Sequence, residues 1–215
     1  MNDVRHYSVG EEIANSVTHG IGLLLAITAL VLLVLGAVQA GDPWRIVSFS
    51  IYGASLVCLY LASTLYHAVP GRRAKEWLRR CDHAAIFLLI AGTYTPIMLV
   101  VLRGPIGWTM AGFVWGIMVV GITLKFLFLQ RFQRLLLGAY VAMGWGAVFV
   151  LQALWQRLPA AAIGWLLAGG ATYTVGVVFY VWKSLPYSHA IWHLFVLGGS
   201  LCHFLFFYLH VLPGR

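Results

Sequence analysis

The chain has 215 residues, of which 61% are hydrophobic and 9% are charged. A soluble domain carries roughly 25% charged residues, so this composition excludes a water-soluble globular protein and indicates that the folded chain is solvated by lipid. The formal net charge is +8, but the basic residues lie between apolar runs and form no single patch. We therefore expect contact with anionic lipid headgroups and no binding of nucleic acid.

Seven apolar runs follow one another along the chain. They lie near 18–39, 44–67, 82–102, 106–125, 135–155, 160–182 and 188–211. Each is long enough to cross the roughly 30 Å hydrocarbon core of a bilayer as an α-helix. The sequence therefore predicts an all-α membrane protein, a seven-transmembrane helix bundle that forms a single domain over residues 1–215.

Glycine and proline separate these runs and also occur inside some of them. The separating segments are Gly41-Asp42-Pro43, Pro70-Gly71, Gly104-Pro105, Pro159 and Pro186. Pro96 lies inside the third run, where we expect a kink that neighbouring helices can accommodate. Gly112, Gly116 and the pair Gly169-Gly170 are expected to let helices approach closely.

The distribution of lysine and arginine predicts the orientation in the membrane. With a cytoplasmic N-terminus, ten basic residues fall on the cytoplasmic side and four on the outer side. The first set is Arg5, Arg72, Arg73, Lys75, Arg79, Arg80, Lys125, Arg131, Arg134 and Lys183, and the second is Arg45, Arg103, Arg157 and Arg215. Because cytoplasmic loops are enriched in basic residues, we predict a cytoplasmic N-terminus and an outer C-terminus.

In this orientation, unusual polar residues from four parts of the chain reach the same cytoplasmic level. Ionisable residues are costly in membrane spans and commonly mark functional sites. The residues are Glu12, Asn15 and His19, which lead into the first run, Ser63 and His67 in the second, Asp82 in the third, and His189 and His193 in the seventh.

The spacing of three of these histidines favours a metal site. His189 and His193 are four residues apart and so share one helix face, and His67 on a facing helix completes three imidazoles. Three protein nitrogens with one open position are the pattern of catalytic zinc, and Asp82 could hold the water or orient a ligand. HxxxH alone is a weak motif, so hydrogen bonding between helices stays as the alternative, and three imidazoles also suit copper, nickel and iron.

The remaining histidines are expected to have structural roles. We expect His203 and His210 to form hydrogen bonds across helix interfaces, and His83 to face the headgroups because it directly follows Asp82 on its helix.

Two roles are open for Glu12, Asn15 and His19. They either cap the first helix and pin it to its neighbours, or line the cytoplasmic mouth of the site. We favour the first role.

Taken together, these motifs resemble those of the hemolysin III family, the bacterial branch of the progestin and adipoQ receptor family, which includes the adiponectin receptors. The match spans nearly the whole chain, and its motifs occur in order on the expected helices. They are Glu12-Ile-Ala-Asn15-Ser-Val-Thr-His19 (ExxNxxxH), Ser63-Thr-Leu-Tyr-His67 (SxxxH), Asp82 at the start of the third helix, and His189-Ala-Ile-Trp-His193 (HxxxH).

The resemblance implies a seven-helix protein of the bacterial inner (plasma) membrane with a cytoplasmic N-terminus. It implies zinc held by His67, His189 and His193. Ser63 and Asp82 would complete a five-residue set shared with alkaline ceramidases and related membrane hydrolases, in which the aspartate is placed beside the zinc-bound water.

Three functional hypotheses are compatible with these observations. The first is an intramembrane zinc hydrolase of lipid amide or ester bonds, linked to membrane homeostasis, in which Asp82 transfers the proton and Ser63 hydrogen-bonds the water or the oxyanion. The second is a receptor-like sensor or regulator of membrane lipid state with structural zinc. The third is a pore or transporter, ranked last because the polar groups gather at one end of the bundle. Membrane lipids are the expected partners and a lipid the expected substrate; the sequence carries no signal for an oligomeric state.

Overall fold

The computed structural model describes residues 7–128 and 132–213, and its regular elements are all helices. They are α1 (Val9–Gln39), α2 (Pro43–Ala68), α3 (Arg72–Pro96), η1 (Ile97–Val101), α4 (Pro105–Leu127), α5 (Gln133–Gly144), η2 (Trp145–Val150), α6 (Leu151–Trp155), α7 (Ala160–Val181), α8 (Ser188–Phe206) and η3 (Phe207–Val211). Within the described residues, these elements make seven helices that are long and apolar enough to cross a membrane. The predicted fold class is therefore confirmed.

Two of the seven helices begin well before the apolar run that predicted them. α1 begins at Val9 because the Ser8 side chain accepts a hydrogen bond from the Glu11 amide while the Glu11 carboxylate accepts one from the Ser8 amide, a capping box. α3 begins at Arg72 and includes the basic stretch ahead of Asp82. As a result, polar residues near the starts of these two helices are held on regular helical turns.

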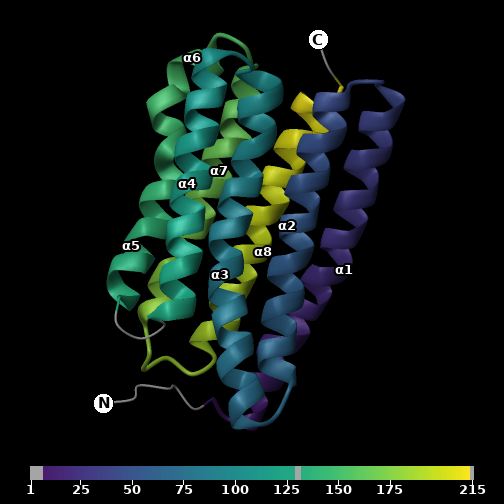
Figure 1. The fold of residues 1–215 in the computed structure, drawn as a ribbon. Coiled ribbons are helices and arrows are strands. Elements are labelled where there is room, and N and C mark those ends of the chain that lie inside the picture. Colours follow the sequence, from purple (N-terminus) through teal and green to yellow (C-terminus); the bar gives the residue numbers. More distant parts are fainter. Residues whose placement is uncertain (1–6, 129–131, 214–215) are drawn as a thin grey trace.

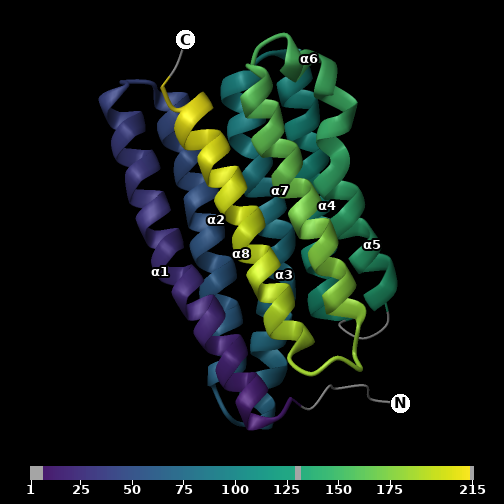
Figure 2. The same ribbon diagram turned by 180° about the vertical axis from the view of Figure 1, so that it is seen from behind.

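The helices stand side by side in one bundle, with α3 near its middle (Figure 1). α1 packs on α2, α2 on α3, and α3 on α4, while α8 packs against α7 and also against α1. Figure 2 shows α8 lying between α1 and α7. α1 is peripheral, and a row of its large apolar side chains is exposed, as lipid contact requires: Leu24, Leu25, Val31, Leu35 and Val38.

Backbone irregularities occur where glycine and proline predicted them. Gly41, Gly71 and Gly104 adopt positive φ angles of 67°, 101° and 138° at the turns between helices. At Pro96 the α-helix gives way to the π-helix η1, which continues the same span. The span from Gln133 to Trp155 is likewise interrupted, by the 3-10 helix η2.

The glycines predicted to allow close packing behave in two ways. A methyl group added to Gly169 would overlap the His203 ring of α8, so this glycine does permit close approach of α7 and α8. At Gly112 and Gly116 an added methyl group would meet nothing within 4 Å. The prediction was wrong for these two because both face outward from α4, where no helix of the described residues covers them.

One end of the bundle collects the polar residues that the sequence analysis singled out. The start of α1, the end of α2, the start of α3 and the start of α8 meet there, at the bottom of Figure 1. We call it the histidine end, defined by His67, His189 and His193. Its cytoplasmic orientation stays a prediction, and three of the basic residues used for it, Arg5, Arg131 and Arg215, lie outside the described residues.

Candidate metal centre

Three buried histidines from two helices meet at the histidine end. His67 lies in the last turn of α2, and His189 and His193 occupy successive turns on one face of α8. α8 begins directly after Tyr187, whose left-handed backbone (φ 57°) turns the chain from the α7–α8 connection into the helix. The predicted histidine set is therefore brought together by the end of one helix and the start of another.

The three rings are close enough to share one ion. One ligand atom from each ring can be chosen so that all three lie within 4.8 Å of one another. The ring centroids are 5.1 Å apart for His67 and His189, 5.3 Å for His67 and His193, and 4.6 Å for His189 and His193. His67 is 3% exposed, His189 6% and His193 0%. An ion bound here would therefore be shielded from bulk water.

The hydrogen bonds of the histidine rings are consistent with a bound metal ion. The Nε2 atoms of His67 and His193 are buried without a hydrogen-bond partner among the described residues, and a buried polar atom left in this state is destabilising. A metal ion would satisfy both atoms. Three imidazole ligands are compatible with zinc, and equally with copper, nickel or iron.

Asp82 and Ser63 lie at the same end and are both buried. Asp82 is in the third turn of α3, is 5% exposed, and lines the same cavity as His189. Ser63 precedes His67 by one turn of α2 and is 1% exposed, and its hydroxyl has no hydrogen-bond partner in the described part of the chain. A buried acid and a buried hydroxyl thus accompany the three histidines.

The motif of α1 reaches the centre but does not cap its helix. Glu12, Asn15 and His19 lie inside α1, whose cap is Ser8 with Glu11. The prediction of a capping role was wrong because the helix starts earlier than its apolar run. The prediction that the motif pins α1 to its neighbours is confirmed: Glu12 pairs with His67 of α2 at 2.6 Å and with Lys75 of α3 at 2.5 Å.

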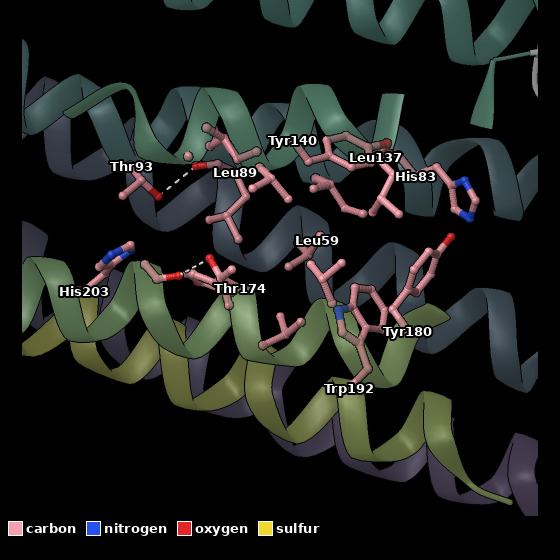
Figure 3. Close-up of a pocket in the computed structure, with 18 of the residues that line it drawn as sticks. Leu59, His83, Leu89, Thr93, Leu137, Tyr140, Thr174, Tyr180, Trp192 and His203 are labelled. Carbon is pink, nitrogen blue, oxygen red and sulfur yellow. Dashed lines mark hydrogen bonds between the residues drawn. The ribbon is translucent and has the colours of Figure 1, made fainter. Parts of the chain in front are cut away.

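A cavity of about 150 Å³ runs from this centre toward the middle of the bundle. At the histidine end it is lined by His19, Asp82, His83 and His189. Leu59 and Leu89 line its middle (Figure 3). Thr93 and His203 line the far end, and Thr174 lies between that end and Leu59 (Figure 3). The labelled histidines His83 and His203 therefore lie toward opposite ends of the cavity, with Leu59 and Leu89 between them (Figure 3).

His83 does not face the headgroups, and that expectation was wrong. Its ring lines the cavity near Tyr180 (Figure 3), and its Nδ1 atom lies 3.2 Å from the Nζ atom of Lys125, which is 2% exposed. The Tyr140 hydroxyl donates to the His83 carbonyl oxygen at 2.8 Å. The cavity is wide enough to be lined by two successive residues of α3, and α4 and α5 cover the side that the sequence assigned to lipid.

The two outer histidines of the last span differ from one another. His203 Nε2 lies 3.4 Å from the Leu166 carbonyl oxygen on α7, in agreement with the predicted contact between helices. His210 Nε2 is buried without a hydrogen-bond partner among the described residues, so the contact expected for that atom is not found.

Some residues of the centre were missed by the sequence analysis. Tyr7 packs on His67 and His189, with ring centroids 5.6 and 5.1 Å away. Lys75 belongs to a basic stretch that was interpreted only as an orientation signal. The hydroxyl oxygen of Thr18, inside the α1 motif, lies 3.2 Å from His193 Nδ1. The position of this threonine, one helical turn after Asn15, is the signal that could have identified it.

Comparison with known proteins identifies relatives along almost the entire chain. The family model "Haemolysin-III related" matches residues 7–204. "Hemolysin-3" of Bacillus cereus is 45% identical over 205 residues, 95% of this chain and 94% of that protein. The "Hemolysin-3 homolog" of Bacillus subtilis (strain 168) is 46% identical, over 92% and 93% of the two chains.

A human relative is more distant. "Monocyte to macrophage differentiation factor" of Homo sapiens is 30% identical over 202 residues, 90% of this chain and 82% of that protein. Together with the seven membrane-spanning helices, the bacterial relatives show a multi-pass integral membrane protein of the bacterial plasma membrane.

Proposed function

This chain belongs to the haemolysin-III related family, and we propose that it is a zinc-dependent hydrolase that cleaves an amide or ester bond of a lipid inside the membrane. The observation that carries the proposal is the three-histidine cluster, one member of which, His189, lines the same largely apolar cavity as the buried carboxylic acid Asp82. A purely structural ion would need neither the acid nor the cavity.

His67, His189 and His193 would hold the zinc ion. Among the described residues this cluster has three members, which matches the ligand count of catalytic zinc; structural zinc commonly has four protein ligands. Bound zinc supplies Lewis acidity, which makes water more acidic and polarises a carbonyl group.

Asp82 is proposed to move the proton. Its carboxylate accepts a proton from the water whose oxygen attacks the carbonyl carbon. The carbon–nitrogen or carbon–oxygen bond then breaks, and Asp82 returns the proton to the departing amine or alcohol. The products are a carboxylic acid and that amine or alcohol, with one water consumed.

Ser63 is proposed to hydrogen-bond the attacking water or the oxyanion. Its hydroxyl is buried without a partner in the described chain, so it can donate to an oxygen that carries developing charge. We do not assign it as the nucleophile because its neighbour one turn later, His67, would be engaged by the metal and could not act as its base.

The cavity supports a lipid as the substrate class. Its walls include the apolar side chains of Leu59, Leu89 and Val196, which suit a hydrocarbon chain. Because the site lies at one end of a membrane bundle, the scissile bond would sit at the interface between the chain and its polar headgroup.

The test is hydrolysis of a panel of lipid amides and esters by detergent-purified protein, with and without zinc. We expect zinc-dependent turnover that falls by about 100-fold or more in Asp82→Asn with zinc still bound. Glu76→Gln is the matched control: it also removes one carboxylate from α3, but at an exposed position. It should leave turnover unchanged. Undiminished turnover in Asp82→Asn or in metal-free protein would contradict the proposal, and bound zinc without any turnover would favour a sensor or regulator.

The names of the bacterial relatives suggest a lytic activity and hence a pore, which is the weaker alternative. A pore should carry polar groups along a continuous path, whereas here the apolar side chains of Leu59 and Leu89 lie between His83 and His203 (Figure 3). We therefore expect liposomes containing the purified protein to retain an encapsulated dye, and release of the dye would support the pore.

A further inference from the structure

The first three turns of α1 surround the outer edges of two of the metal-binding histidines. We infer that this segment, from Glu12 to Thr18, is the outer coordination sphere of the metal centre and that Glu12 is the positioning residue for His67. The inference rests on the zinc site proposed above and assigns a role to a motif that the hydrolytic mechanism leaves unused.

The contact between Glu12 and His67 fixes the proton on the imidazole ring. Glu12 Oε2 lies 2.6 Å from His67 Nδ1, and the other carboxylate oxygen lies 2.5 Å from Lys75 Nζ. A carboxylate paired with an ammonium group is ionised and only accepts hydrogen bonds, so His67 Nδ1 must carry the proton. The lone pair of His67 is then on Nε2, which is buried without a hydrogen-bond partner in the described chain and is therefore free to bind the metal.

Asn15 does not alter this assignment. Its Nδ2 atom lies 3.4 Å from the same His67 nitrogen, but a ring nitrogen that donates to a carboxylate cannot also accept from an amide. The shorter contact, with a charged partner, therefore sets the tautomer.

The same segment fixes His193 in the same way. The Nδ1 atom of His193 lies 3.2 Å from the Asn15 carbonyl oxygen and 3.2 Å from Thr18 Oγ1. The Thr18 hydroxyl donates to the Ala14 carbonyl at 2.8 Å, so its oxygen is free to accept. Both partners thus accept from Nδ1–H. The lone pair of His193 is then on Nε2, which is also buried without a hydrogen-bond partner among the described residues.

Outer partners of this kind orient the ring and make the ligating nitrogen more basic. The Glu12 carboxylate does both, because its charge also offsets the charge that the metal brings into a buried site. Lys75 in turn holds Glu12 in place from the first turn of α3. Three helices are thereby tied to one ligand, His67.

Glu11 is the matched control because it neighbours Glu12 but has different contacts. It completes the α1 capping box, and its Oε1 atom accepts a hydrogen bond from the Tyr187 amide at 3.2 Å. Glu11→Gln removes the same charge from the same helical turn while keeping an oxygen that can accept.

The experiment measures the affinity of the full-length, detergent-purified protein for Zn²⁺ alone, by competition with a chromophoric chelator. We expect Glu12→Gln to raise the zinc Kd by about 10- to 100-fold and Glu11→Gln to change it by less than about 3-fold. Lys75→Gln, at a position that is part-exposed, should raise the Kd by a smaller factor and provides the test if Glu12→Gln does not fold.

A second measurement tests whether Glu12 positions the His67 ring or only stabilises the fold. In metal-free protein labelled with ¹⁵N-histidine, the His67 signal, assigned by its loss in His67→Ala, should show the proton on Nδ1. Glu12→Gln should shift it toward the other tautomer while thermal stability is retained. An unchanged Kd and an unchanged His67 signal in Glu12→Gln would overturn the inference and leave the metal centre intact, whereas wild-type protein that binds no zinc would overturn the proposed function itself.

Discussion

The His19 ring lies flat against His193, with ring centroids 3.5 Å apart and 14° between the ring planes. Both ring nitrogens of His19 are buried without a hydrogen-bond partner in the described chain. The geometry therefore points to a stacking role, in which His19 holds the His193 ring against rotation.

This role predicts different outcomes for two substitutions of His19. His19→Ala leaves a void beside His193 and should weaken zinc binding by about 10-fold, as for other outer contacts of metal ligands. His19→Phe keeps a flat ring and should stay within about 3-fold of wild type. Equal losses in both variants, measured by chelator competition, would show that the nitrogens of His19 matter and that stacking is not its role.

Metal removal should destabilise the protein because the ligands come from different helices. At a free zinc concentration of 100 times the Kd, binding to the folded state alone contributes about 2.7 kcal/mol. A chelator should therefore lower the unfolding temperature of wild-type protein in detergent. His193→Ala should show no shift on chelator addition, and an equal shift in that variant would place the stabilising metal elsewhere.

Two glycines on different helices, α7 and α4, should respond differently to the same substitution. In Gly169→Ala the new methyl group would meet the His203 ring, and such overpacking typically costs about 1–3 kcal/mol. Gly112→Ala adds a methyl group that meets nothing within 4 Å and should be neutral or stabilising by up to about 1 kcal/mol. The free energy of unfolding in detergent checks both, and similar losses in the two variants would contradict the packing described for α7 and α8.

The predicted orientation can be tested with reporter fusions. Alkaline phosphatase, which is active only outside the cytoplasm, should be active when fused to the C-terminus and inactive when fused after Gly71, in the turn between α2 and α3. The physical reason is the cluster of basic residues at the start of α3, which cytoplasmic loops favour. The reverse pattern would place the histidine end outside the cell.

Much of the fold follows from hydropathy, because a chain in lipid must form its backbone hydrogen bonds within each helical span. The seven helices and the turns at Gly41, Gly71 and Gly104 were predictable for that reason. The start of α1 was not, since its capping box at Ser8 precedes the apolar run that marked the helix. The outward direction of Gly112 depends on which helices flank α4, and helical periodicity does not specify that.

The metal cluster was likewise predictable in part. The spacing of His189 and His193 alone predicts that they share a helix face. The position of His67 near the end of the second apolar run predicts that it lies at the same depth in the membrane. The link from Glu12 through Lys75 depends on how α1 and α3 approach each other, which the spacing within either helix does not determine. The inward position of His83 depends in the same way on Lys125, which α4 brings against it.

The central claim is that His67, His189 and His193 form a metal centre, and metal content tests it most directly. Mass spectrometry of detergent-purified protein, prepared without chelators, should find about one zinc ion per chain in wild type. It should find essentially none in His67→Ala or in the double variant His189→Ala/His193→Ala. A wild-type protein without bound metal, or variants that retain it in full, would contradict the account and leave these histidines as hydrogen-bonding residues between helices.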